Sequence, residues 1–235
     1  MSHEDFDIES LAAYLHLNLQ QVTRLADRGK LPGRKVGGKW RFARAEIHHW
    51  LEDRIGLSDE EQLAEVEDAL QRSAGAKSQE HVCIADLLSV EAVAVPLAAR
   101  TKNSVIRSMV SLAMQTGLLW EERKMADAVR AREDMAPTAL GNGVALLHPR
   151  RPMAKILQEP FLAFGRTATG IPFGGSHGGM TDLFFLICST DDQGHLRALA
   201  RLSRILAVPG LLEALREVPD PKAAHRLIAE TEEGL

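Results

Sequence analysis

Residues 141–150 read GNGVALLHPR. A glycine-containing turn leads into four aliphatic residues, the run ends at His148, and a proline and two arginines follow. A short apolar run bounded by turn residues is typical of a buried strand. The stretch therefore predicts a strand over Val144 to Leu147 with a titratable imidazole at its carboxyl end.

The surrounding sequence predicts a sheet covered by helices. Apolar runs at 161–164 and 183–188 predict two more strands, while residues 84–131 and the stretches GHLRALARLSRILA and LLEALREV show helical patterns. Strands without polar alternation are buried on both faces, so helices should cover both sides of the sheet. We expect an α/β (α+β) domain of three layers, with a mixed sheet between helices.

In such sheets, binding and catalytic residues usually lie at the ends of the strands. His195 follows Gly194 at the predicted start of a helix, where free backbone N–H groups favour an anion. Arg132 and Arg150 supply guanidinium groups that can fork onto phosphate oxygens. A histidine nucleophile needs a neutral ring with one unprotonated nitrogen, while the other nitrogen forms a hydrogen bond to a partner. The alternative for any of the nine histidines is a structural or exposed role.

Residues 1–56 predict a small, mostly α-helical domain. Asp7 can cap a first helix, and Asn18 with Gln21 resembles a capping box at the start of a second. Gly29 should end that second helix. Two short helices joined by a tight turn indicate a helix-turn-helix.

A basic segment completes this domain. Gly37-Gly38 is a two-residue hairpin signal, and a third helix follows it. Between Arg24 and Arg44 lie eight basic residues and one acid. They fall on the second helix and the hairpin, the elements that can enter a major groove and neutralise phosphates. DNA binding is the prediction, and a solvated basic face is the alternative.

Residues 57–80 predict an acidic connector helix followed by a flexible hinge. Its apolar positions allow two interpretations, a solvated connector or a short seam that pairs two chains as a homodimer. Residues 81–235 then form the second domain.

The whole chain fits a protein of two domains, with 235 residues and a net charge of −4. Cys83 and Cys188 lie in apolar surroundings, which predicts buried free thiols in a reducing compartment. The acidic N-terminus is unlike a signal peptide, and no apolar run reaches transmembrane length. We expect a cytoplasmic protein without membrane insertion. The histidines lack zinc-site spacing, so we expect no metal site and no cofactor.

The stretch RGKLPGRKVGGKWRF, followed by EIHHWL, resembles the wing and third helix of the excisionase-type, MerR-like winged helix-turn-helix domain, over roughly residues 6–54. This resemblance implies that the second helix and the wing contact DNA. The residues implied are Gln20, Gln21, Thr23, Arg24 and Arg28 on the helix, and Lys35, Lys39 and Arg41 on the wing.

AREDMAPTALGNGVALLHPR, with GIPFGG and GHLRALARLSRIL, resembles the enzyme IIA domain of the phosphoenolpyruvate-dependent phosphotransferase system, of the fructose, mannitol and nitrogen-regulatory type. The resemblance implies that His148 accepts a phosphoryl group from a small phosphocarrier protein of the HPr type. It makes His195 the second active-site histidine, Arg132 the phosphate-stabilising arginine and Thr138 a hydrogen-bonding residue.

Two positions depart from that family's pattern. Leu147 stands where a proline usually precedes the histidine, and His177 replaces an acidic loop residue. The resulting hypothesis is a DNA-binding regulator set by phosphorylation of His148, and it expects the His148 ring to be reachable from solvent. The alternatives are an IIA-like sensor without phosphotransfer, on a DNA-binding protein, and a sugar-transport phosphotransferase component.

Overall fold

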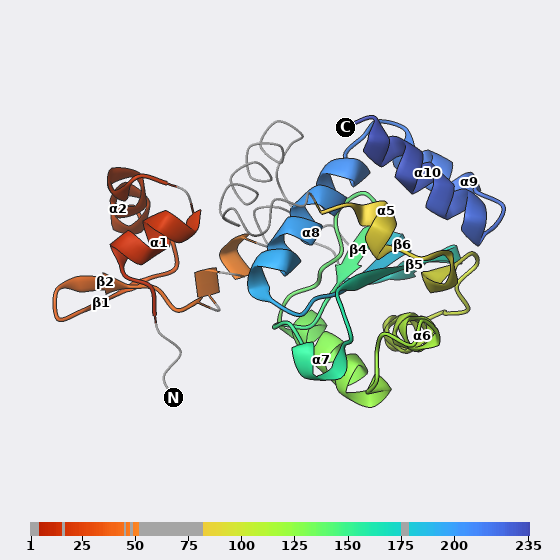
Figure 1. The fold of residues 1–235 in the computed structure, drawn as a ribbon, viewed down its shortest axis with the longest axis horizontal. Coiled ribbons are helices and arrows are strands. Elements are labelled where there is room, and N and C mark those ends of the chain that lie inside the picture. The colour runs from red at the N-terminus through yellow and green to blue at the C-terminus, as the bar shows by residue number, and fades with distance from the viewer. Residues whose placement is uncertain (1–4, 16, 45, 48, 52–81, 175–178) are drawn as a thin grey trace. The chain divides into compact units, whose positions relative to one another are not determined.

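The computed structural model describes residues 5–15, 17–44, 46–47, 49–51, 82–174 and 179–235. The chain divides into two compact units, Met1–His81 and Val82–Leu235 (Figure 1), and both contain buried hydrophobic residues. The predicted connector over 57–80 lies outside the described residues. The predicted domain limits at 56 and 80 therefore stay predictions.

The N-terminal unit contains the predicted helices and hairpin. α1 spans Ile8–Leu15, and the Asp7 carboxylate accepts the Ser10 N–H at 2.8 Å, as a capping residue does. α2 spans Leu19–Asp27 and begins with a capping box between Asn18 and Gln21. Helical residues also lie between 44 and 51, and the buried Ile47 and Leu51 come from that segment.

The hairpin pairs β1, Arg34–Val36, with β2, Lys39–Arg41, in antiparallel register. Gly37 and Gly38 form its turn with φ of 57° and 79°. Both values lie in the left-handed region that glycine adopts without steric cost, so the dipeptide sets this turn.

A four-stranded mixed sheet forms the centre of the C-terminal unit, in the order β3-β5-β6-β4. β5 and β6 are antiparallel, whereas β3 lies parallel to β5 and β4 lies parallel to β6. The strands span Val93–Ala94 (β3), Val144–Leu147 (β4), Phe161–Pro172 (β5) and Met180–Cys188 (β6).

Helices cover both faces of this sheet, so the predicted three-layer arrangement is confirmed (Figure 1). α6 and α7 lie on one face, and α5, α8 and α10 lie on the other. The helices span Ile84–Leu87 (α5), Lys102–Gln115 (α6), Glu122–Met135 (α7), Asp192–Leu206 (α8), Leu211–Glu217 (α9) and Pro221–Glu233 (α10), with short 3-10 turns at Val90–Ala92 (η1) and Ala154–Ile156 (η2).

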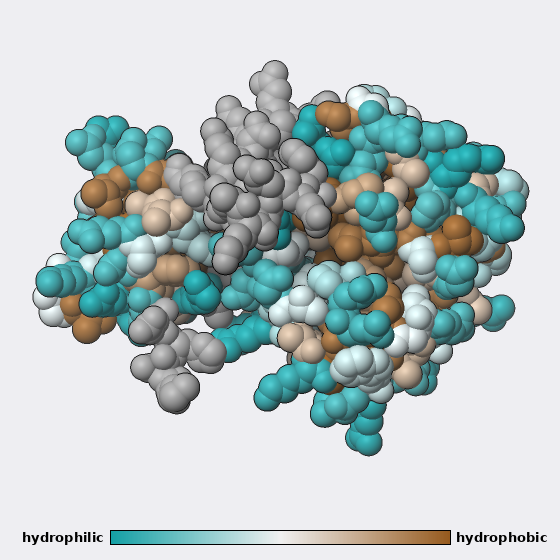
Figure 2. All heavy atoms as spheres, in the orientation of Figure 1, coloured by the Kyte–Doolittle hydropathy of each residue, from teal (hydrophilic) through white to brown (hydrophobic). Residues whose placement is uncertain are grey.

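Aromatic side chains from the two long strands, and from Phe173 just after β5, fill the core. Phe164 and Phe185 lie 4.7 Å apart between ring centroids, and Phe173 and Phe184 lie 5.1 Å apart. Figure 2 shows hydrophilic residues over the outer helices and hydrophobic residues mainly toward the middle of the visible face of this unit. None of the helices among the described residues is long and apolar enough to cross a bilayer.

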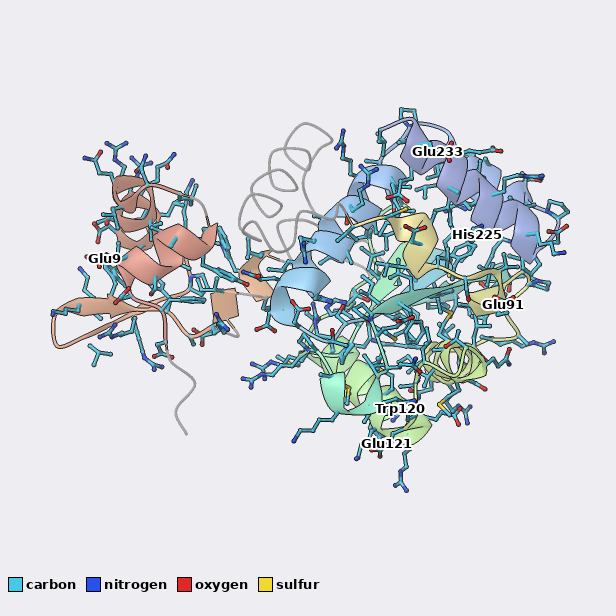
Figure 3. The ribbon with its side chains drawn as sticks, in the orientation of Figure 1. Glu9, Glu91, Trp120, Glu121, His225 and Glu233 are labelled. Atoms are coloured by element: carbon cyan, nitrogen blue, oxygen red, sulfur yellow. The ribbon has the colours of Figure 1, made fainter. Side chains whose placement is uncertain are left out.

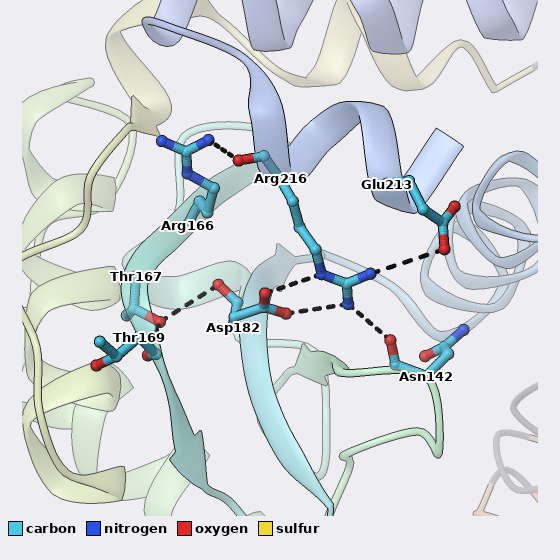
Figure 4. Close-up of polar contacts among 7 residues, drawn as sticks. All are labelled: Asn142, Arg166, Thr167, Thr169, Asp182, Glu213 and Arg216. Atoms are coloured by element: carbon cyan, nitrogen blue, oxygen red, sulfur yellow. Dashed lines mark hydrogen bonds and ion pairs between the residues drawn. The ribbon is translucent and has the colours of Figure 1, made fainter. Parts of the chain in front are cut away.

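A polar cluster holds the turn that starts β4. The Arg216 guanidinium binds both carboxylate oxygens of Asp182 and donates to the Asn142 carbonyl at 2.8 Å (Figure 4). Gly143 has φ of 87°, and a Cβ at that position would lie 2.5 Å from Arg216 Nη2. The GNG turn therefore needs its second glycine for both backbone angle and space.

Candidate functional site

The carboxyl ends of β4 and β6 meet at one edge of the sheet, because these strands run parallel. Leu147 pairs with Leu186, so His148 and Ser189 both lie just beyond that edge. His195 comes from α8, which follows β6 directly. The fold thus gathers at one place residues that are up to 47 positions apart in the sequence.

Backbone contact fixes the chemical form of His148. Its Nδ1 lies 2.7 Å from the carbonyl oxygen of Leu146. A carbonyl can only accept, so Nδ1 carries the proton in this hydrogen bond. In a neutral imidazole this leaves the lone pair on Nε2, which makes Nε2 the nucleophilic nitrogen.

The two candidate histidines lie together, as the hypothesis requires. The ring centroids of His148 and His195 are 5.0 Å apart, with the rings tilted by 52°. His148 is 3% exposed and His195 is 2% exposed. The expectation of a solvent-reachable ring at His148 is therefore wrong for this conformation, because the residue is buried.

The helix start near His195 also differs from expectation. α8 begins three residues earlier, at Asp192, and Asp191 is its N-cap. The Asp191 carboxylate accepts the Gly194 N–H at 2.8 Å, and the His195 N–H donates to the Asp191 carbonyl at 3.1 Å. His195 is thus inside the first turn, and these two backbone N–H groups already have protein acceptors. Its ring, not its backbone, is the group offered to the site.

Arg132 is held by the loop that follows α7. It is 4% exposed, and its Nη1 donates to the Ala136 carbonyl at 2.8 Å. Further along this loop the Thr138 carbonyl accepts the Leu146 N–H at 3.3 Å. These bonds tie Arg132 to the strand that ends in His148. The other predicted guanidinium, from Arg150, lies on an exposed residue just after His148.

Thr138 forms hydrogen bonds to the carboxylate of Glu133. Its hydroxyl and its backbone N–H both bind the Glu133 carboxylate, and Lys102 Nζ lies 3.3 Å from Glu133 Oε2. Glu133 is 2% exposed, so this pairing offsets the cost of a buried charge. The structure therefore indicates that Thr138 holds the loop beside β4 through Glu133.

The sequence interpretation missed Ser189 as a site residue. Ser189 is 3% exposed, and its Oγ lies 3.3 Å from His195 Nδ1. One signal was available, since Ser189 is the first polar residue after the apolar run LFFLIC and therefore lies at the same edge as His148. The partners of Glu133 could not be found this way, because Lys102 comes from another helix.

The two departures from the family pattern differ in what the structure describes. Leu147 is fully buried and pairs with Leu186 in the sheet, so it serves the core. His177 lies outside the described residues.

The helix predicted to contact DNA presents most of its candidates to solvent. Gln20, Gln21, Arg24 and Arg28 are exposed, and Thr23 is half-buried. Local bonds already engage two of them. Gln21 Oε1 accepts the Asn18 N–H at 3.0 Å, and the Thr23 hydroxyl donates to the Leu19 carbonyl at 2.8 Å.

An acidic residue links the hairpin to this helix. Asp27 Oδ1 accepts from Trp40 Nε1 at 3.3 Å and lies 3.7 Å from Lys35 Nζ, while Lys35 also lies over the Trp40 ring. Lys39 is exposed at the turn. Arg41 is half-buried and lies 3.7 Å from Asp7, the residue that caps α1.

Comparisons with known proteins match two separate parts of the chain. Residues 86–231 match the family described as "Phosphoenolpyruvate-dependent sugar phosphotransferase system, EIIA 2", and residues 6–55 match the helix-turn-helix domain family. The chain is 32% identical over 149 residues to a nitrogen regulatory protein of Bradyrhizobium diazoefficiens, covering 62% of this chain and 94% of that protein. It is 29% identical over 147 residues to the fructose-specific EIIABC component of Bacillus subtilis, covering 62% of this chain and 23% of that protein.

Solved structures support the same fold. The crystal structure of the nitrogen regulatory protein IIA-Ntr from Neisseria meningitidis aligns with a TM-score of 0.56 at 21% identity, over 62% of this chain and 98% of that one. IIA mannitol from Escherichia coli aligns with a TM-score of 0.54 at 21% identity, over 60% of this chain and 98% of that one. Because the match over 86–231 exceeds half of the sequence, the chain belongs to the EIIA 2 family of the phosphoenolpyruvate-dependent sugar phosphotransferase system, and it carries a helix-turn-helix domain on the N-terminal side.

Proposed function

We propose that this chain is a cytoplasmic DNA-binding regulator whose activity is set by phosphorylation of His148 by an HPr-type phosphocarrier protein. The observation that carries the proposal is the buried pair of histidines, in which the Leu146 carbonyl holds His148 Nδ1 and directs the lone pair to Nε2. Family membership supports the phosphoryl chemistry, and the helix-turn-helix domain supports DNA binding.

The proposed roles follow from the contacts. Nε2 of His148 attacks the phosphorus atom, while the other ring proton stays on Nδ1, which donates to the Leu146 carbonyl. His195 and Arg132 supply donors to the phosphoryl oxygens, because this transfer depends on positioning and charge. Thr138 fixes the loop that carries Arg132, through its bonds to Glu133.

The enclosed site requires movement before transfer. At 3% exposure, His148 cannot meet a donor protein in the described conformation. We propose that the phosphocarrier binds an opened form of this edge, with a population set by a small conformational free energy. The phosphoryl group adds a charge of about −1.5 to −2. We propose that this charge keeps the sheet edge in a conformation different from the described one.

Regulation would arise from this added charge. The charge can act on the N-terminal domain of the same chain or on a second copy of the chain. In both cases it repels DNA phosphates. The proposal therefore predicts weaker DNA binding by the phosphorylated protein at low salt. The predicted connector over 57–80 is the proposed route for pairing two chains, and the acidic residues there would limit non-specific binding to DNA.

The decisive experiment measures phosphoryl uptake. The full chain is incubated with phosphoenolpyruvate, enzyme I and HPr, and intact mass is recorded at neutral or basic pH, where phosphohistidine survives. We expect one added phosphoryl group on the wild type and none on His148→Ala. His225→Ala is the matched control, because His225 lies on α10 away from the sheet edge (Figure 3). No added mass on the wild type, or equal labelling of His148→Ala, contradicts the proposal.

A second candidate function is favoured by the burial of His148. An IIA-like domain that senses a partner without accepting phosphate would keep this edge closed. It predicts no phosphoryl uptake, with DNA binding unchanged in His148→Ala. The third candidate, a sugar-transport component, predicts uptake without DNA binding. The same mass measurement, together with a DNA titration, therefore separates all three.

A further inference from the structure

Ser189 occupies a fixed position between the two elements that carry the histidines. It follows Cys188, the last residue of β6, and its carbonyl accepts the Met153 N–H at 3.0 Å from the segment that follows His148. Its side chain lies 3.3 Å from His195 Nδ1, and both residues are at most 3% exposed. Its backbone is therefore anchored while its hydroxyl touches the second histidine.

Proton counting leaves two arrangements for this hydrogen bond. A serine hydroxyl has one proton and two acceptor lone pairs. If His195 Nδ1–H donated to Ser189 Oγ, the buried hydroxyl proton would lack an acceptor among the described residues. If the hydroxyl donates to Nδ1, its proton and the ring lone pair are both satisfied, and the ring proton lies on Nε2. Only the second arrangement leaves a ring N–H of neutral His195 to donate to a phosphoryl oxygen, because the first uses that N–H on Ser189.

We infer that Ser189 is a positioning residue that fixes His195 in the tautomer with its proton on Nε2. The pair then consists of two opposite tautomers. His148 has a proton on Nδ1 and a bare Nε2, whereas His195 has a bare Nδ1 and a proton on Nε2. One ring is thereby prepared to attack and the other to donate while both are neutral.

The use made of this proton rests on the proposed phosphorylation of His148. In that step the N–P bond of the donor's phosphohistidine breaks as the His148 Nε2–P bond forms, and the donor nitrogen keeps the bonding electron pair. No proton moves at His148, because Nδ1 keeps its proton and donates it in the hydrogen bond to the Leu146 carbonyl. His195 Nε2–H donates a hydrogen bond to a phosphoryl oxygen without losing its proton. Without Ser189, His195 can carry its proton on Nδ1 instead. Its unprotonated Nε2 would then face the phosphoryl oxygen and repel it.

The first test reads the tautomer in the unphosphorylated full-length chain. Two-bond proton–nitrogen correlation spectra of ¹⁵N-histidine protein distinguish the two neutral tautomers, and a His195→Gln spectrum assigns the signals. We expect Nε2–H for His195 in the wild type and in Ser189→Thr, which keeps a hydroxyl. Ser189→Ala should convert a measurable share of His195 to the Nδ1–H form.

A matched control separates an effect on the fold from an effect on the His195 tautomer. Ser203→Ala removes another buried serine hydroxyl from α8, eight positions after His195. It should leave the His195 tautomer unchanged, and backbone amide spectra of every variant report whether the fold is intact. A wild-type His195 with its proton on Nδ1, or a Ser189→Ala spectrum identical to wild type, overturns the inference regardless of phosphoryl uptake.

The second test measures the consequence for transfer. A lost neutral hydrogen bond is worth about 0.5–1.5 kcal/mol, so Ser189→Ala should slow phosphoryl uptake about 2- to 13-fold. Ser189→Thr should restore most of the rate. If the wild type takes up no phosphoryl group, the proposed function fails while the tautomer assignment is still decided by the spectra. Normal uptake by Ser189→Ala with a changed tautomer overturns the role of the tautomer in transfer.

Discussion

Glu232 is the buried charge whose removal should most weaken the C-terminal domain. It is 6% exposed near the end of α10, yet it accepts the backbone N–H groups of Ile84 and Ala85 at 2.9 Å each. Its Oε1 also lies 2.9 Å from Arg201 Nε, and Arg201 donates to the Glu232 carbonyl at 3.1 Å. One carboxylate thus ties α5, α8 and α10 together.

The structure sets the size of the effect. Glu232→Ala removes the carboxylate that pairs with Arg201, whose side chain is 16% exposed, and it removes this acceptor from the two N–H groups of α5. Removing one member of a buried ion pair costs about 3–5 kcal/mol. Because some water can reach Arg201, we expect about 3 kcal/mol. Glu232→Gln keeps an oxygen for one N–H but loses the charge and the second acceptor oxygen, so we expect about 1–2 kcal/mol.

The pH dependence gives an independent check. Burial raises the pKa of the Glu232 carboxyl, but the Ile84 N–H, the Arg201 guanidinium and the Ala85 N–H outweigh it, so the pKa lies below its ordinary value of 4.5. The unfolded chain then takes up the proton at a higher pH than the native protein. The contribution to stability is complete above the ordinary value and is lost as pH falls through the lowered pKa. The gap between wild type and Glu232→Gln should therefore shrink in acid.

The assay is urea unfolding at pH 7 and pH 4, with peptide-resolved hydrogen exchange across β4 to β6 to isolate the C-terminal domain. Glu233→Gln is the control, because Glu233 is exposed at the adjoining position of α10 (Figure 3). It should change stability by less than about 0.5 kcal/mol. A Glu232→Ala variant within that range, or a Glu232→Gln gap that grows in acid, would refute this account.

Three other predictions concern exposed and strained positions. Lys39→Ala should lower the slope of log affinity against log salt by about 0.9 for a short labelled duplex, because one phosphate contact is lost, and an unchanged slope would remove Lys39 from the interface. Gly143→Ala should cost about 2–3 kcal/mol in urea unfolding from its positive φ and crowding, whereas Gly141→Ala, with nothing within 4 Å of its Cβ, should be near neutral. Burial raises the pKa of both thiols, so iodoacetamide should label the half-buried Cys83 slowly in native protein and the buried Cys188 only after unfolding; rapid native labelling of Cys188 would contradict its burial.

Local pattern was sufficient for most elements. The strand over Val144–Leu147 was predicted with its observed bounds, because four apolar residues lie between a glycine turn and a charged segment. The hairpin turn at Gly37-Gly38 was equally direct. β5 and β6 extend beyond their apolar runs, since pairing with each other stabilises polar residues that no local pattern would place in a strand. The two-residue β3 and the helix α10 were missed.

Cys83 shows a different kind of error. The apolar neighbours on both sides predicted burial, yet the residue is half-buried, and its Sγ lies 3.4 Å from Glu232 Oε2. The deeply buried Cys188 fits its prediction, because it ends a central strand. Neighbours along the chain report hydrophobicity, whereas exposure depends on which helix covers the segment.

The amino-acid sequence by itself determined three of the four strands of the central sheet, the caps of α1 and α2, the hairpin turn and the location of His148 at a strand end, because periodicity and turn chemistry act over a few residues. Only the tertiary structure decided what surrounds that histidine. The contact of His195 with Ser189, the enclosure of His148 and the Glu232 clamp on α5 join residues from different elements, in the last case 148 positions apart. Such contacts depend on how helices pack on both faces of the sheet, and packing joins surfaces that have no fixed spacing in the sequence.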